Sequence, residues 1–202
     1  MINTDIFEEK KMFYAPKQLV YETLNARKLY RRGFNEVVNQ TKTIEEIMRR
    51  SSLQSNIISI LLKYLYMHTS EIDYEIFTNE IGLDISQDNN LSSDIVIFDA
   101  DDALQYQFDG HYFHVAPKIA FQVDVKIELG DTNVVEYLRE KNKVLFDFGV
   151  ERVVWIFTED KKILLAQPNR VWLMSHWSKD TELLEGHKIN LQNMIDEKRY
   201  QN

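Results

Sequence analysis

The stretch PKIAFQVDVKIELGD, residues 117–131, decides what fold we expect for this chain. In an extended strand, side chains two residues apart point to the same face. One face of the predicted strand is therefore wholly apolar. The other carries an amide, a carboxylate and an ammonium group, from Gln122, Asp124 and Lys126. A core strand with three polar groups in a row needs a chemical reason, because unpartnered buried charges are costly.

The sequence around this stretch alternates between strand and helix patterns. Helical patterns fall on residues 15–25, 51–68 and 132–149, after Thr43 in TIEE, and after Asn190. Strand patterns fall on residues 73–85, 93–100, 117–127, 151–167 and 170–177. Asp109-Gly110 lies between aromatic alternations and predicts a hairpin. This order predicts a mixed α/β (α+β) fold with a central mixed sheet flanked by helices.

We expect a single domain, because 6 Gly and 3 Pro in 202 residues leave little linker material. Its three parts are an N-terminal helical part of about residues 1–68, a core of about 72–170, and C-terminal strands and a helix of about 171–202.

Composition excludes several classes of protein. With no cysteine, thiolate metal sites and disulfides are impossible, and a cytoplasmic location is expected. The longest apolar run is interrupted by Lys63 and is too short to span a bilayer. The chain also lacks phosphate-cradling glycine loops, a nucleophile elbow and a dinucleotide fingerprint.

Charge is distributed unevenly along the chain. The net charge is −8, yet residues 1–65 hold 11 basic and 7 acidic residues. Basic residues cluster at Arg27, Lys28, Arg31, Arg32, Arg49 and Arg50. Two interpretations stand: a solvated helix face, or a patch that contacts phosphates on an otherwise acidic protein.

The polar face of the 117–127 strand has two interpretations as well. Asp124 and Lys126 could form an ion pair on a solvated sheet surface. Alternatively, Asp124 could share a divalent cation with Asp94, which lies near the start of the preceding strand. A cation would relieve the repulsion between two carboxylates, and hard oxygen ligands suit Mg²⁺ or Mn²⁺. Lys126 could then orient a water molecule or stabilise charge on a phosphate.

An Asp followed about thirty residues later by Asp-x-Lys resembles the pattern of the PD-(D/E)XK phosphodiesterases. A longer match extends over about residues 15–170 and resembles the Uma-two family of restriction-endonuclease-like proteins. The matching positions are Asp94, Pro117, Gln122-Val123, Lys141, Gly149-Val150 and Trp155. This resemblance implies a restriction-endonuclease-like core with a metal site at the sheet edge, and homodimers as a common assembly.

The resemblance leaves two alignments of the metal-site motif on this sequence, which we call the first and second frames. In the first, Asp124 and Lys126 are the Asp-x-Lys pair. In the second, Gln122 stands where the family usually has Glu, and Lys141 supplies the positive charge. The metal ligands would be Asp94 with either Asp124 or Gln122. Glu80 is a possible accessory acidic group.

The leading hypothesis is therefore a Mg²⁺- or Mn²⁺-dependent DNA endonuclease with Asp94, Gln122, Asp124, Lys126 and Lys141 as candidate catalytic residues. Gln122 would make it weak or inactive if the second frame holds. The rival is a non-catalytic homo-oligomeric binding or assembly module of the same fold. A third hypothesis is a phosphodiesterase that acts on RNA or a small nucleotide.

Overall fold

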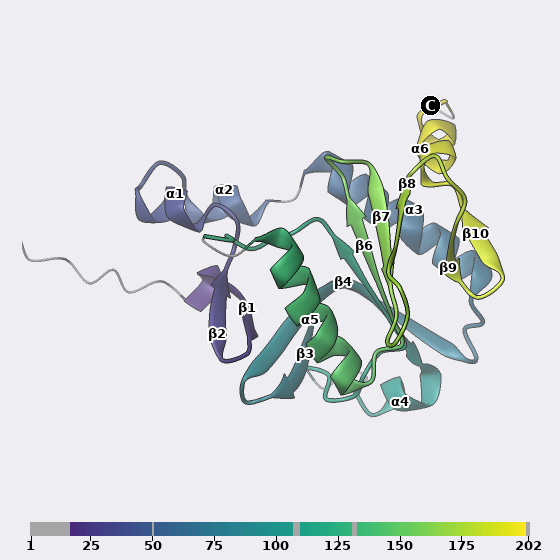
Figure 1. Cartoon of the computed structure of the whole chain (residues 1–202), viewed down its shortest axis with the longest axis horizontal. Helices are drawn as coiled ribbons and strands as arrows, with labels where there is room; N and C mark the ends of the chain where they lie inside the picture. Colours follow the sequence, from purple (N-terminus) through teal and green to yellow (C-terminus); the bar gives the residue numbers. More distant parts are fainter. Residues whose placement is uncertain (1–16, 50, 107–109, 131–132, 201–202) are drawn as a thin grey trace, which may run out of the picture.

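The computed structural model describes residues 17–49, 51–106, 110–130 and 133–200 (Figure 1). Its elements are η1 (Lys17–Leu19), β1 (Val20–Leu24), β2 (Arg27–Tyr30), α1 (Phe34–Val38), α2 (Ile44–Met48), α3 (Ser52–His68), β3 (Tyr74–Ser86), β4 (Asn89–Asp99), α4 (Ala100–Leu104), β5 (Ile119–Val123), α5 (Val134–Phe148), β6 (Arg152–Phe157), β7 (Lys162–Ala166), β8 (Leu173–His176), β9 (Thr181–Leu184), β10 (His187–Ile189) and α6 (Leu191–Tyr200). The expected mixed α/β fold with a central sheet is confirmed.

The central sheet has eight strands, in the order β2-β1-β4-β5-β6-β7-β8, with β3 paired to β4 off this path. β5 and β6 run parallel, and the other pairs are antiparallel, so the sheet is mixed. The β5–α5–β6 unit provides the crossover that a parallel pair requires. β9 and β10 form a separate two-stranded sheet.

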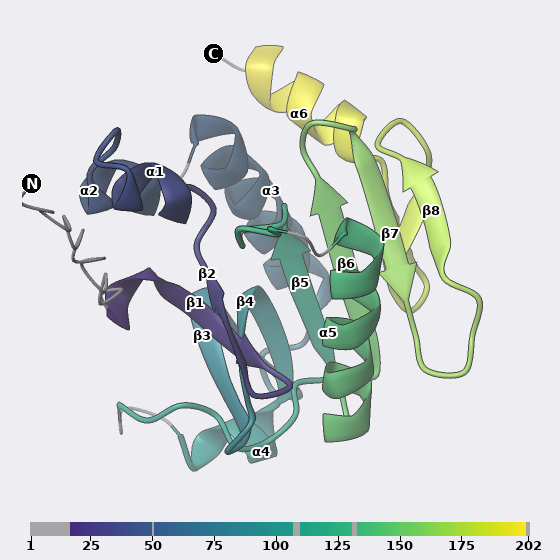
Figure 2. The ribbon, with the colours of Figure 1, turned by 60° about the vertical axis from the view of Figure 1, so that its left-hand side comes forward.

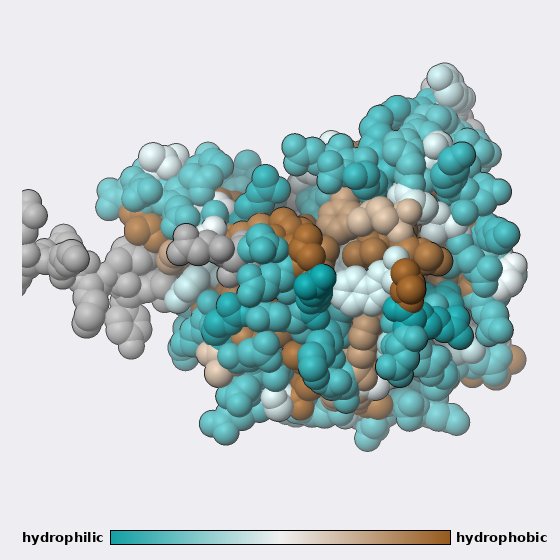
Figure 3. Space-filling view, in the orientation of Figure 1, coloured by the Kyte–Doolittle hydropathy of each residue, from teal (hydrophilic) through white to brown (hydrophobic). Residues whose placement is uncertain are grey.

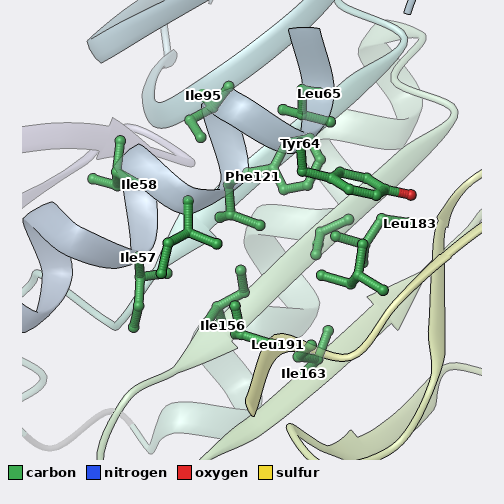
Figure 4. Close-up of a cluster of buried hydrophobic side chains, with 14 of the residues drawn as sticks. Ile57, Ile58, Tyr64, Leu65, Ile95, Phe121, Ile156, Ile163, Leu183 and Leu191 are labelled. Carbon is green, nitrogen blue, oxygen red and sulfur yellow. The ribbon is translucent and has the colours of Figure 1, made fainter. Parts of the chain in front are cut away.

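Helices cover both faces of the central sheet (Figure 2). α3 and α6 pack on one face, where their apolar residues join a cluster that includes Ile95, Phe121 and Ile156 (Figure 4). α5 packs on the other face through Tyr137, Leu138 and Leu145. The alternation along β4 and β5 supplies both cores, since successive side chains point to opposite faces.

Local sequence accounts for the helix boundaries. Thr43 begins α2 and Ser51 begins α3, each with a complete capping box that satisfies first-turn N–H groups. The Asn133 side chain accepts a hydrogen bond at the start of α5. Gly149, with φ of 125°, ends that helix. The Asn190 side chain caps α6 by accepting from the amide of Asn193. The predicted starts at Thr43 and Asn190 are thus confirmed.

Two expectations differ from the structure, and a third falls partly outside the described residues. The helix expected at 15–25 is wrong: from Lys17 onward, where the described residues begin, the chain forms η1 and then β1, which pairs with β2. The strand expected at 117–127 ends at Val123. The hairpin turn expected at Asp109-Gly110 falls partly on residues 107–109, which lie outside the described residues. Beyond it, Phe113 forms only an isolated bridge to Leu83.

The surface on the α5 side is mainly hydrophilic, with some apolar side chains gathered beyond α5, over β7 and β8 (Figure 3). Exposed apolar residues of this region include Val171, Leu173 and Met174. Among the described helices, none has the length and apolar character needed to cross a membrane.

Candidate functional site

The site forms where two strands diverge along one edge of β4. β1 pairs with β4 at Asn90, and β5 pairs with it from Ile95 onward. On that edge, residues 91–94 have no strand partner within the described chain. Their backbone groups must be satisfied in another way, because unpaired buried peptide groups are costly. Polar side chains from β1, β5 and α5 fill this gap.

Register brings Asp94 and Gln122 to the same place. The last pair between the two antiparallel strands is Ile95 with Phe121. One residue further in the same register puts Asp94 opposite Gln122. Both side chains are buried, at 0% and 2% exposure. They lie on the α5 face, since Gln122 contacts a residue of that helix.

Gln122 is held by both ends of its amide. Its Nε2 donates to the Ser92 carbonyl at 3.1 Å and to Ser93 Oγ at 2.8 Å. Its Oε1 accepts from Lys141 Nζ at 3.4 Å. The amide therefore replaces part of the missing strand pairing and also touches the helix lysine, as the second frame requires.

Lys141 and Glu22 form a fully buried ion pair. Lys141 Nζ lies 2.7 Å from Glu22 Oε2, and both side chains are 0% exposed. The ammonium group also donates to the Ser92 carbonyl at 2.8 Å. Glu22 Oε1 accepts from the Tyr137 hydroxyl at 2.7 Å. Three aromatic rings, those of Tyr21, Tyr137 and Trp155, lie within 5.8 Å of the ammonium group.

Sequence reasoning missed Glu22. The residue lies in the segment that was expected to be helical, and it looked like one acidic residue among many. The signal that could have revealed it is its position within the strand-like stretch LVYETL, whose Leu19, Tyr21 and Leu24 are buried. A buried acidic residue implies a buried cation, and Lys141 is that partner.

A second group of charges lies beside the first. Lys126 Nζ forms an ion pair with Asp94 Oδ1 and lies 3.8 Å from Glu80 Oε1. Glu80 in turn pairs with Arg31 at 2.7 Å. Asp94 Oδ2 also accepts from the Val123 amide at 2.7 Å. Lys126 is 11% exposed, and Arg31 and Glu80, at 16% and 21%, form the outer part of this group.

A β-bulge aims Glu80 at this group. The register between β3 and β4 shifts between Thr78 and Ile81. Asn79 and Glu80 both have positive φ, 87° and 56°. Bulges of this kind re-aim a side chain and are frequent beside active sites. The structure therefore brings the predicted accessory residue Glu80 to Asp94 and Lys126.

Asp124 and Asp94 have different hydrogen-bond and ion-pair partners. Its φ of 63° is left-handed, which ends β5 and breaks the alternation expected for residues 122–126. Its carboxylate accepts from the Thr158 amide at 2.6 Å, the Thr158 hydroxyl at 2.8 Å and Gln54 Nε2 at 2.9 Å. Asp124 thus fastens the end of β5 to β6 and α3. No contact between Asp124 and Asp94 joins the two carboxylates within the described chain.

Two tyrosines report the electrostatics of the cluster. Burial raises the pKa of Tyr21 well above its usual value, and the carboxylates of Asp94, Glu22 and Glu80 raise it further. Burial, followed by Glu22, raises the pKa of Tyr137 in the same way. Both hydroxyls therefore stay protonated around neutral pH.

The donor set fits a hard divalent cation. Glu22 and Asp94 offer carboxylates and Gln122 offers an amide oxygen, all ligand types that Mg²⁺ takes. The buried hydroxyl of Tyr21 has no hydrogen-bond partner among the described residues, which leaves a polar atom for a hydrated ion to satisfy. Among those residues, no group of three or more acidic or histidine side chains could hold a metal ion by itself. Water and a substrate phosphate would complete the shell, as is usual for Mg²⁺.

Comparison with known proteins gives one informative result. No family model matches the chain, and no curated protein matches it by sequence. Among solved structures, it is similar to an Anabaena variabilis protein described as a "putative nuclease belonging to DUF820", with a TM-score of 0.52 and 10% sequence identity. The similarity covers 71% of this chain and 78% of that one. At this identity the likeness shows the fold alone.

Proposed function

We propose that this protein is a metal-dependent DNA endonuclease of the PD-(D/E)XK type whose activity is limited by Gln122. The observation that carries the proposal is the register that puts Asp94 opposite Gln122, beside Lys141, where β1 and β5 diverge. The nuclease-like fold and the resemblance to the Uma-two family support it. It follows the second of the two frames, with Gln122 rather than Asp124 at the ligand position.

The residues would divide the work as follows. Asp94, Gln122 and Glu22 would hold Mg²⁺ or Mn²⁺, and Lys141 holds Gln122 and Glu22 in place. When bound, the ion would supply Lewis-acid stabilisation of the charge that develops on the phosphate. Lys126, the outer ammonium group, would contact the phosphodiester or orient the attacking water.

Gln122 weakens this site because an amide oxygen is neutral. One unit of negative charge near a dication is worth several kcal/mol, about 4 kcal/mol for unit charges 4 Å apart at an effective dielectric of 20. In addition, Lys126 and Lys141 already neutralise Asp94 and Glu22. We therefore expect weak ion binding and slow cleavage.

Cleavage of plasmid DNA in Mn²⁺ tests the proposal. We expect slow nicking by the natural chain, no nicking by Asp94→Asn, and faster nicking by Gln122→Glu. Equal activity in the natural chain and Asp94→Asn would remove Asp94 from the site.

A second candidate function is a non-catalytic, homo-oligomeric binding module. It is favoured by the pairing of all three carboxylates, Glu22, Asp94 and Glu80, with cationic side chains. The edge strand β8 also exposes Leu173 and Met174, which could contact a second copy. A dimer in light scattering, together with no thermal shift in Mn²⁺, would favour this candidate over the nuclease.

A further inference from the structure

A polar groove of about 460 Å³ opens beside the Asp94 cluster. It lies between the end of β2, the helices α1 and α2, and the segment that follows β5. The cationic residues that line it are Arg31, Arg32, Lys42, Arg49 and Lys126. Five of the thirteen lining residues are therefore basic, on a protein whose net charge is −8. Arg50, which the sequence placed in the same patch, lies outside the described residues.

Backbone contacts build this groove and fix Lys126 in it. The Arg32 amide donates to the Lys126 carbonyl at 2.7 Å, so the two residues are neighbours across the groove. The Gly33 amide donates to Glu128 at 3.0 Å. Gly33 has a φ of 94°, and a Cβ there would come within 2.7 Å of Ile47. A glycine is therefore required where the chain turns from β2 into α1.

The acidic residues of the groove are already engaged. Glu36 pairs with Lys42 at 3.2 Å, and Glu80 pairs with Arg31 at 2.7 Å. The Glu46 carboxylate accepts from the Thr43 amide in the capping box of α2. In the part of the chain that the structure describes, no ion pair involves Arg32 or Arg49, and both are exposed. The groove thus offers positive charge to an anionic ligand.

We propose that this groove binds the phosphodiester backbone of a single DNA strand, and that Lys126 couples strand binding to cation binding at Asp94. The inference rests on the proposed function, because it assigns the substrate path and the regulation of the same site. The volume lies in the range of small-ligand sites, roughly 300–1,000 Å³, and we therefore assign the groove the backbone of one strand and test a duplex against it.

The coupling follows from the position of Lys126, which lines the groove and is also the ion-pair partner of Asp94. A phosphate in the groove gives its ammonium group a second anion. As Lys126 turns toward that phosphate, the Asp94 carboxylate loses its counter-ion and becomes available to a dication. The strand and the ion therefore bind better together than apart.

Titration calorimetry of Mn²⁺ tests the coupling in the natural chain. A phosphorothioate single strand is used so that it is not cleaved. We expect it to lower the Mn²⁺ Kd about tenfold, and Mn²⁺ to lower the Kd of the strand by the same factor, because binding free energies are reciprocal. An unchanged Mn²⁺ Kd would overturn the coupling. An equal effect from inorganic phosphate or from duplex DNA would overturn the assignment to a single strand.

Lys126→Met separates this coupling from general charge effects. The variant should bind Mn²⁺ about tenfold more tightly without DNA, and the strand should then change that Kd less than about twofold. The matched control is Lys143→Met, which removes an exposed lysine of α5 and should behave as the natural chain. Full coupling in Lys126→Met would overturn the role of Lys126. If Lys126→Met does not fold, the reciprocal titrations of the natural chain still decide.

Salt dependence tests the groove itself. Each phosphate contact to a single strand contributes about 0.7 to the slope of log K against log salt, so Arg32→Ala/Arg49→Ala should lower that slope by about 1.4. Arg139→Ala/Arg170→Ala removes the same charge from exposed positions outside the groove and should leave the slope unchanged. An equal loss in both double variants would overturn the groove assignment.

The two proposals fail in different ways. If Mn²⁺-dependent cleavage requires Asp94 while the strand leaves Mn²⁺ affinity unchanged, the coupling is wrong and the nuclease proposal stands. If Mn²⁺ does not bind with or without DNA, the nuclease proposal fails, and the coupling fails with it. Binding of the strand that depends on Arg32 and Arg49 would then leave the groove as an independent binding site.

Discussion

Lys126 and Lys141 lie in one polar cluster but in different surroundings. The side chain of Lys141 is 0% exposed and pairs with the equally buried Glu22. Lys126 is 11% exposed, pairs with Asp94 and lines the groove. Both are ammonium groups opposite a buried carboxylate. The difference is that only Lys126 has a groove into which it can move.

This contrast suggests different roles for the two ion pairs: Lys141–Glu22 supports the structure, and Lys126–Asp94 is suited to exchange of the lysine for a metal ion. Lys141 also donates to the Ser92 carbonyl, which β1 and β5 leave unpaired. If Lys141 moved away, the Ser92 carbonyl and the Glu22 carboxylate would both lose a buried partner. Lys126 can leave the equally buried Asp94 at low cost only when a dication takes its place there. We therefore assign scaffolding to Lys141 and ligand exchange to Lys126.

The largest effect is expected at Lys141. Lys141→Met should destabilise the fold by about 3–5 kcal/mol, because Glu22 would be left buried and unpaired. The double variant Glu22→Gln/Lys141→Met should recover most of that loss. Urea unfolding measures both, with Lys143→Met as the control for an exposed lysine. A loss below about 1 kcal/mol in Lys141→Met would contradict the scaffolding role.

The next effect concerns the ion at Asp94. A cation that binds only the native state at 100 times its Kd adds about 2.7 kcal/mol to the free energy of unfolding. Mn²⁺ should therefore raise the melting temperature of the natural chain. Asp94→Asn should show no such rise. A rise of equal size in both proteins would place the ion elsewhere.

A smaller contrast is expected between two buried tyrosines. Tyr137→Phe removes a hydrogen bond to the Glu22 carboxylate and should cost about 1.5–3 kcal/mol. Tyr21→Phe removes a hydroxyl with no partner among the described residues, so its cost without metal should be below about 0.5 kcal/mol. Denaturant unfolding compares the two variants. An equal loss in both would mean that the Tyr21 hydroxyl bonds a buried water.

The effect that is smallest near neutral pH, and that grows only at alkaline pH, is the dependence of stability on tyrosine ionisation. The pKa values of Tyr21 and Tyr137 are raised in the folded state, so the stabilisation is fully present below about pH 10 and is lost above it. The unfolded chain ionises first and releases protons that the folded chain keeps. Above pH 10, each tyrosine should lower the free energy of unfolding by about 1.4 kcal/mol per pH unit. The slope for Tyr21→Phe/Tyr137→Phe, measured by unfolding from about pH 9 to about pH 11, should be shallower. Identical slopes would show that both hydroxyls ionise in the folded state.

Sequence predicted the elements that local pattern determines. α3 and α5 carry clear apolar periodicity and capping residues, and β3, β4, β6 and β7 carry clear alternation or apolar runs. β1 and β2 were missed because they are short strands in a segment with many polar residues. β1 also pairs with β4, which lies far along the chain.

The candidate site was predictable only in part. The pattern found Asp94, Gln122, Lys126 and Lys141, which the structure brings into one cluster. Alternation implied that Asp124 would join them, but its left-handed φ turns its carboxylate to Thr158. A backbone conformation of that kind is set by tertiary contacts. The same turn lets Lys126 reach back to Asp94. The roles of these residues remain predictions.

Calorimetric titration of Mn²⁺ into Gln122→Glu and Asp124→Asn tests the central claim most directly, namely that Gln122 and not Asp124 stands at the ion position beside Asp94. Asn tolerates a left-handed φ, so Asp124→Asn should keep the turn. The account predicts that Gln122→Glu tightens Mn²⁺ binding at least about tenfold, from the added charge, and that Asp124→Asn changes it less than about threefold. Loss of binding in Asp124→Asn with no gain in Gln122→Glu would contradict it.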